Sequence, residues 1–292
     1  MILAWACTAP LHDELVVPGD VAAETWIGEE GSGLGTQVAT GGGVVVATAP
    51  GTGEVWTDGE LSSFGPGTFA VWVGADGPRL GWAGRGIYTL PDGEEVHALP
   101  AARAFAGSVD GYAWATEVEV VSSRGERWEL AGVRDLAVAE DRVVAVACDG
   151  GCEAWQLDAS GLALLGPAGE GGRVTLHQSV ACYSDPELSD DGGGGVVRCE
   201  DGREVRGEPG DHLGRALGGG YAAGGLNPLL VPHRARIVPL DGGTVLAVDR
   251  SVETRPLSLA GDDHRLVVGV PGYPLSLAEA GAVHVVVAAD LP

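Results

Sequence analysis

The chain has 292 residues, a length that suits either two average domains or one large all-β domain. Its 49 glycines and 17 prolines, with 45% hydrophobic residues, describe a turn-rich protein that can still bury a core. The formal net charge of −24 disfavours nucleic acid and anionic membrane surfaces as partners. Every basic residue is arginine, which excludes lysine-dependent chemistry such as Schiff-base catalysis or a phosphate-loop lysine.

The amino terminus is a short apolar run that ends at Cys7 and is followed by a polar stretch containing Pro10. It resembles the end of a bacterial lipoprotein signal, in which small residues precede the cysteine that receives the lipid. The run is shorter than the roughly 7–15 residues of a signal h-region, and a true start upstream of Met1 is one explanation of this difference. A buried or frayed terminus with a free thiol is the alternative. We expect lipidation at Cys7 and no other contact with the membrane.

Three stretches of the chain share one pattern, in which a short strand, a tight turn, an apolar strand, a second turn and a third strand follow one another. They cover residues 38–56, 136–155 and 257–286, and weaker copies begin near Phe69, Arg103, Thr175 and Ala216. The starts are spaced by roughly 32 to 41 residues, which is the period of a propeller blade.

Seven such units fill the chain from about residue 33 to 290, and no segment shows a convincing helical period. Radial closure of the units would hide the sheet edges that separate small sheets expose. We therefore predict an all-β fold, a seven-bladed β-propeller, with six or eight blades as alternatives. Residues 33–292 form the single domain, and residues 1–32 supply the signal-like segment and a lead-in strand that pairs with the last blade. Apolar strands such as 143–147 are expected to be the inner, fully buried ones.

Four cysteines occur as two local pairs. Cys148 and Cys152 flank a three-residue turn, and Cys182 and Cys199 flank a glycine-rich loop that can fold back as a hairpin. Each pair would then be cross-strand neighbours, close enough to bridge. A four-cysteine zinc site is the rival, but the CxxxC spacing fits it poorly. We predict two disulfides and hence an oxidising compartment.

An acidic cluster lies in the same loop. Asp185, Glu187, Asp190 and Asp191 fall within seven residues and offer the oxygen ligands that calcium prefers. They are candidate calcium ligands, with a solvated acidic loop as the alternative. No other cofactor is expected.

No catalytic motif is found. The seven histidines show no HxH or HExxH pairing, and there is no G-x-S-x-G sequence. His264 lies beside Asp262 and Asp263, but all three fall in a tight turn of a repeat, where a surface turn is expected. We therefore predict that the protein is not an enzyme.

The repeats resemble the FG-GAP repeat of integrin-α-type β-propellers, in the short bacterial form. The matching segments are 34–39 with 47–50, 213–217, and 266–271 with 281–286. The resemblance implies a propeller that presents rim loops to a partner. The long integrin form carries a calcium loop between these segments, which is shortened here to 40–42, 139–141 and 261–263. Calcium is therefore not implied for these blades.

We predict a non-enzymatic, monomeric binding or adhesion module of the bacterial cell envelope, an outer-membrane lipoprotein or a secreted protein. Its partner would be a protein or a glycan, contacted by the longer segments 183–195 and 221–236. One alternative is a quinoprotein-like scaffold that assists outer-membrane assembly, whose docking motif is echoed at 51–56, 125–128 and 152–155. The tryptophans there are expected to pack between blades in either case. The second alternative is a propeller enzyme, a lyase or glycosidase, with carboxylates or histidines gathered at one channel mouth.

Overall fold

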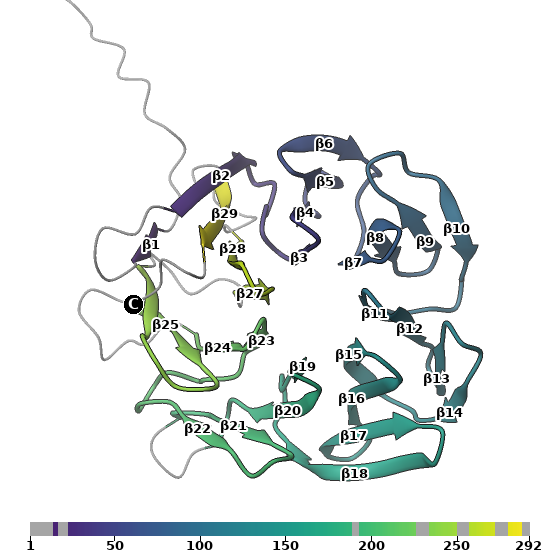
Figure 1. Ribbon diagram of the computed structural model, residues 1–292, viewed down its shortest axis with the longest axis vertical. Coiled ribbons are helices and arrows are strands. Elements are labelled where there is room, and N and C mark those ends of the chain that lie inside the picture. The colour runs from purple at the N-terminus through teal and green to yellow at the C-terminus, as the bar shows by residue number, and fades with distance from the viewer. Residues whose placement is uncertain are drawn as a thin grey trace, which may run out of the picture.

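A computed structural model describes residues 14–16, 23–188, 193–225, 234–249, 257–271 and 280–287. Every regular element within these ranges is a β-strand. The strands form seven antiparallel sheets, which are arranged as blades around a ring (Figure 1). The chain is a seven-bladed β-propeller, which confirms the all-β prediction and the blade count.

Blades 1 to 5 each consist of four consecutive strands, with the first strand innermost. Blade 1 comprises β3 Val38–Gly41, β4 Val44–Ala49, β5 Glu54–Thr57 and β6 Glu60–Ser63. Blade 2 comprises β7 Phe69–Gly74, β8 Gly77–Trp82, β9 Gly86–Thr89 and β10 Glu95–Ala98. Blade 3 comprises β11 Ala104–Ser108, β12 Gly111–Ala115, β13 Glu119–Ser122 and β14 Arg127–Glu129. Blade 4 comprises β15 Val133–Ala139, β16 Arg142–Cys148, β17 Cys152–Asp158 and β18 Gly161–Ala168. Blade 5 comprises β19 Val174–His177, β20 Val180–Asp185, β21 Val196–Cys199 and β22 Glu204–Arg206.

The last two blades are completed by strands from the start of the chain. Blade 6 comprises β23 Ala216–Gly218, β24 Tyr221–Ala223, β25 Arg234–Pro239 and β26 Leu246–Asp249, with β1 Glu14–Val16 as a fifth, outer strand. Blade 7 comprises β27 Ser258–Gly261, β28 Arg265–Val270 and β29 Ala280–Val287, with β2 Ala23–Glu30 outermost. The predicted pairing of a lead-in strand with the last blade is confirmed by β2, whereas the pairing of β1 was not foreseen.

The three clear repeats are the first three strands of blades 1, 4 and 7, and the weaker copies begin within one residue of β7, β11, β19 and β23. The apolar strand over 143–147 is fully buried, as predicted, but it is the second strand of its blade and not the innermost. The reason is geometric: a second strand is covered by strands on both edges and by blades on both faces.

The core lies between neighbouring blades. Trp128 of blade 3 packs with Leu136 and Val143 of blade 4, and its Nε1 donates a hydrogen bond to the carbonyl of Asp158. Trp56 of blade 1 lies in the cluster shared with blade 7. An indole buries a large apolar area, so each such contact holds two blades together. The predicted packing of the tryptophans between blades is confirmed.

The meander gives the propeller two different faces. The turn face carries the connections from first to second and from third to fourth strand. The loop face carries the connections from second to third strand and from blade to blade. On the loop face, the second-to-third connections of blades 1 to 4 are 50–53, 83–85, 116–118 and 149–151, whereas those of blades 5 to 7 are 186–195, 224–233 and 271–279. Long connections are thus confined to one side of the ring on one face.

Candidate functional site

The two segments predicted to contact a partner lie on the same face of adjacent blades. Segment 183–195 contains the connection from β20 to β21 of blade 5, and segment 221–236 contains the connection from β24 to β25 of blade 6. Because both are second-to-third connections, both emerge on the loop face. Residues 189–192 and 226–233 of these segments lie outside the described residues. We call the described part of this region, residues 186–188, 193–195, 207–215 and 224–225, the blade 5–6 loop surface.

Charged side chains join the parts of the blade 5–6 loop surface. Arg215 Nη2 lies 3.2 Å from Glu187 Oε1, and His212 Nδ1 lies 3.7 Å from Glu187 Oε2. Arg215 and His212 come from the connection between blades 5 and 6. The sequence analysis did not predict this connection as part of a binding surface. Glu187 is exposed, so these contacts orient the loop without burying a charge.

A buried carboxylate holds the base of this surface. The Asp211 side chain is fully buried, and its Oδ2 accepts hydrogen bonds from Arg236 Nη1 at 2.9 Å and from the Glu208 backbone N–H at 2.8 Å. The Asp211 carbonyl accepts a bond from the N–H of Gly225. A buried charge that is paired and hydrogen-bonded in this way fixes its surroundings. Asp211 therefore ties the blade-to-blade connection to both ends of the blade 6 loop.

The four candidate calcium ligands are only partly described. Asp185 ends β20 and Glu187 is engaged by Arg215, while Asp190 and Asp191 lie outside the described residues. Among the residues that the structure describes, no three His, Cys, Asp or Glu side chains are placed to hold a metal ion. Calcium at this loop stays a prediction.

Both predicted disulfides are present. Cys148 is bonded to Cys152 and Cys182 to Cys199, and the members of each pair are opposite one another on neighbouring strands. Their Cα atoms lie 4.1 Å and 4.0 Å apart. Pairing of all four thiols excludes the four-cysteine zinc site. Cys7, the predicted lipidation site, lies outside the described residues.

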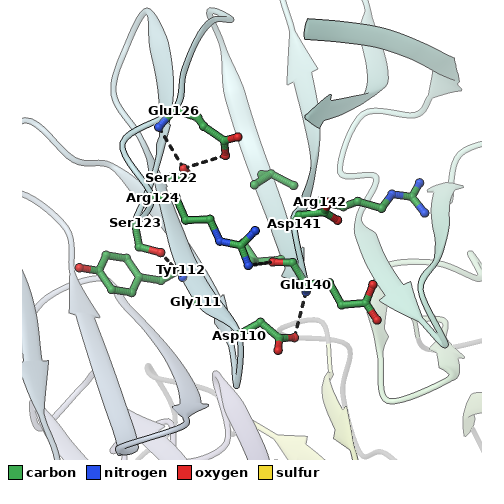
Figure 2. A pocket seen from close by; sticks show the side chains of 12 residues that line it. Asp110, Gly111, Tyr112, Ser122, Ser123, Arg124, Glu126, Glu140, Asp141 and Arg142 are labelled. Carbon is green, nitrogen blue, oxygen red and sulfur yellow. Dashed lines mark hydrogen bonds between the residues drawn. The ribbon is translucent and has the colours of Figure 1, made fainter. Parts of the chain in front are cut away.

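A pocket opens on the turn face between blades 3 and 4 (Figure 2). Arg124 Nη2 donates to the Glu140 carbonyl at 2.7 Å, and the Glu140 N–H donates to Asp110 Oδ2 at 2.9 Å. About 250 Å³ of empty space, open solvent included, lies between the residues that line the pocket. Its polar groups bond to one another across the blade boundary, so the pocket is a seam between blades.

The seam continues to blade 5 through Arg142, whose side chain points away from the pocket in Figure 2. Its guanidinium donates to the carbonyl of Ser179, to the side chain of Gln156 and, at 2.6 Å, to Glu200. These hydrogen bonds hold the pKa of Glu200 below its ordinary value and raise that of Arg142. Blades 3, 4 and 5 are thus joined by one continuous polar network on the turn face.

One carboxyl group lies where the innermost strands of blades 4 and 5 begin, on the loop face. Asp135 follows a β-bulge in β15, and its Oδ1 lies 3.3 Å from Arg173 Nη1 while its Oδ2 accepts the Val174 N–H at 2.9 Å. The side chain keeps 23% exposure but is enclosed by two blades, so desolvation raises its pKa, with Arg173 opposing. Both oxygens are used to tie β15 to β19.

The remaining acid–base candidate, His264 beside Asp262 and Asp263, lies in a surface turn. Asp262 Oδ1 accepts the N–H groups of His264 and Arg265, and His264 is exposed. This is the surface turn that was expected.

No protein family and no curated protein matches the chain. Several solved structures share its fold. A virginiamycin B lyase from Staphylococcus aureus is 10% identical, with a TM-score of 0.57 over 91% of this chain and 99% of the lyase. The Cps50 (Swd1) β-propeller domain from Myceliophteria thermophila is 11% identical, with a TM-score of 0.57 over 92% and 99%. A chain of a mitotic checkpoint complex is 12% identical, with a TM-score of 0.54 over 97% and 98%.

At these identities the likeness establishes the seven-bladed propeller and nothing finer. The FG-GAP resemblance is neither supported nor replaced by a matching family. In the described part of the chain, no helix has the length and apolar character to cross a membrane.

Proposed function

We propose that the protein is a non-enzymatic binding module of the bacterial cell envelope that contacts a protein or glycan with its blade 5–6 loop surface. The observation that carries this proposal is the unequal length of equivalent connections. Blades 1 to 4 join their second and third strands over three or four residues, whereas blades 5 to 7 use 186–195, 224–233 and 271–279, of which the first two flank the connection 207–215. Loops that a rigid scaffold does not need, placed side by side on one face, are where binding residues concentrate.

The bases of these loops are held in place. Asp211 and Arg236 form a mostly buried ion pair, and Arg215 orients Glu187 above it. A surface that is fixed before binding loses less conformational entropy when the partner arrives. The geometry therefore supports recognition by a preorganised surface.

The resemblance to FG-GAP propellers and the envelope location belong to the same proposal. The clearest FG-GAP-like residues fall on β28 and β29 of blade 7. Two disulfides support an oxidising compartment, since such bonds persist outside the cytosol. Lipidation at Cys7 would add a membrane anchor.

A propeller enzyme is the second candidate, and one observation favours it. Asp135, on the innermost strand of blade 4, is a carboxyl group of raised pKa, which is a feature of general acids. A structurally similar propeller is named as a lyase. Both Asp135 oxygens are already engaged between blades, however, so we assign this group a structural role.

Photo-crosslinking tests the proposed surface, because a chain without lysine offers amine-directed reagents no side-chain amine. A photoreactive amino acid would replace Glu187 on the loop face or, as the matched control, Asp76 in an exposed turn of the opposite face. In isolated bacterial envelopes, we expect a discrete adduct from position 187 and none from position 76. Equal labelling from both positions would contradict the assignment.

Loop shortening gives an independent measurement. Replacing 187–194 by a turn of the length found in blade 4 should lower binding to envelopes at least about tenfold, because the loop's contacts are lost. The control shortens 90–94, a turn-face connection of blade 2. Undiminished binding by the first variant, with its unfolding midpoint preserved, would refute the proposal.

A further inference from the structure

The outermost strand of blade 4, β18, differs from the other described outer strands. It spans eight residues, Gly161–Ala168, and none of them is charged (Figure 1). The outer strands of the other blades, namely β1, β2, β6, β10, β14 and β22, each carry at least one Glu or Arg. Charged side chains on an edge strand prevent it from pairing with other chains. β18 lacks this protection.

The side chains of β18 are apolar and exposed. Leu162 is 41% exposed and Leu164 55% exposed, although the protein has few large apolar residues at its described surface. They lie opposite Leu157 and Trp155 of β17, so both point to the same face of the sheet. β18 is the last strand of its sheet, so no strand of this chain pairs with its outer edge, although the Leu165 carbonyl accepts a hydrogen bond from the Tyr183 hydroxyl of blade 5.

We propose that β18 pairs with β18 of a second copy of this chain, antiparallel about Ala163, and so forms a symmetric dimer. A two-fold axis through Ala163 places Leu162 opposite Leu164 of the other copy. All four leucines then share one face, where cross-strand apolar pairs stabilise a sheet. The sequence Leu-Ala-Leu is symmetric about its centre, which is what a self-complementary interface requires.

Charge favours β18 over the rest of the surface as the site of contact between two copies. The chain carries a net charge of −24, so contact between most surfaces of two copies brings carboxylates together. In the proposed register, Gly161–Leu165 of one copy faces Leu165–Gly161 of the other, and none of these residues is charged, so no carboxylate opposes another across the strands. The interface would replace the monomer expected from sequence.

The remaining repulsion is long-range and screened by salt. The screening length falls from about 14 Å at 0.05 M to about 4 Å at 0.5 M ionic strength. Dimerisation should therefore strengthen as salt is added, whereas an interface of ion pairs would weaken.

Sedimentation velocity over about a hundredfold range of concentration tests the dimer with the full chain. We expect a concentration-dependent shift from monomer to dimer that Leu164→Arg weakens about tenfold or more. This substitution reduces the net negative charge, so added repulsion does not explain the loss. Leu61→Arg on β6 is the matched control, because Leu61 is 54% exposed on the outer strand of blade 1. Its dimerisation should equal that of the wild type.

Cysteine crosslinking tests the register. In a Cys7→Ser background, Ala163→Cys should give a disulfide-linked dimer on mild oxidation, since directly opposite residues of antiparallel strands lie within bridging distance. A mixture of Leu162→Cys and Leu164→Cys chains should crosslink to each other, and Leu61→Cys should not crosslink. A wild type that stays monomeric at every concentration and salt, or an Ala163→Cys chain that crosslinks no better than Leu61→Cys, would overturn the proposal.

Discussion

Blades 4 and 5 are neighbours with the same arrangement of four consecutive strands, but different features stabilise them. The four strands of blade 4 have 7, 7, 7 and 8 residues, and those of blade 5 have 4, 6, 4 and 3. The second-to-third connection is 149–151 in blade 4 and 186–195 in blade 5. The disulfide of blade 4 closes that short turn, whereas the disulfide of blade 5 joins two strands inside the core.

The comparison indicates that the blade with the long loop has shorter strands and therefore fewer backbone hydrogen bonds. Blade 4 has a long ladder of backbone hydrogen bonds, and its disulfide closes only a short turn. Blade 5 has a short ladder, so its stability depends more on the Cys182–Cys199 bond and on contacts with blade 4. The stable blade exposes an outer strand for pairing, and the short-stranded blade presents a loop surface.

The largest expected effect comes from removing the disulfides. The Cys182→Ala/Cys199→Ala variant should lose about 3 kcal/mol of unfolding free energy, because the bond closes a loop with a separation of 17 residues. The Cys148→Ala/Cys152→Ala variant should lose about 2 kcal/mol, because its separation is 4 residues. Chemical denaturation of both variants and the wild type gives these differences.

The side chains of Cys182 and Cys199 are also buried, so truncation there leaves a cavity that adds to the loss. If the blade 4 variant is destabilised as much as the blade 5 variant, the contrast between the two blades does not hold.

A smaller loss of unfolding free energy is expected when the hydrogen bonds between blades 4 and 5 on the turn face are removed. Arg142→Ala should lower the unfolding free energy by about 1–2 kcal/mol, since Glu200 and the Ser179 carbonyl lose a charged donor whose own side chain is 19% exposed. Arg127→Ala, which breaks an exposed pair with Glu119 inside blade 3, is the control and should cost less than about 1 kcal/mol.

The Arg142 contribution should depend on pH. The pKa of Glu200 is lowered in the folded protein, so its stabilising effect is present above the ordinary glutamate pKa of 4.5 and is lost as the pH falls through the lower folded value. The free-energy difference between wild type and Arg142→Ala should shrink below about pH 4.5. A difference that is constant down to the acid unfolding transition would show that the charge pair is not its source.

Asp135, on the loop face, should change the stability with pH in the opposite direction. Its pKa is raised, so ionisation is less favourable in the folded than in the unfolded protein, and stability decreases as the pH rises from the ordinary value of 3.8 through the folded value. Asp135→Asn keeps an acceptor for the Val174 N–H and should remove this decrease. Asp135→Ala leaves that N–H without its acceptor and should cost about 1–2 kcal/mol.

Urea unfolding of the three proteins between about pH 4 and 7 separates these outcomes. Equal losses in the Asn and Ala variants at neutral pH would mean that the carboxylate charge itself, paired with Arg173, stabilises the junction.

The repeat and the cysteines could be predicted from the sequence because they are local. Valine-rich strands between tight turns recur at blade spacing, and Cys182 lies opposite Cys199 because the intervening loop folds back on itself. The partners Arg142 and Glu200 could not be paired in this way, because 58 residues separate them and only the packing of blade 4 against blade 5 brings them together. The same holds for Asp211 and Arg236, whose contact crosses a blade boundary.

The smallest expected effect concerns the turn that begins β20. Gln178 and Ser179 have φ values of 50° and 62°, so both central residues of this two-residue turn are left-handed. Turns of this kind favour Asn at the first position, because its short polar side chain tolerates a positive φ better than glutamine does. Gln178 is exposed, and Gln178→Asn should therefore stabilise the protein by about 0.5 kcal/mol. Gln178→Val, with a β-branched side chain, should destabilise it, and Gln178→Ala should lie between them. Precise thermal unfolding of the three variants would reveal this order; an Asn variant no more stable than the Ala variant would show that the φ angle does not limit the short ladder of blade 5.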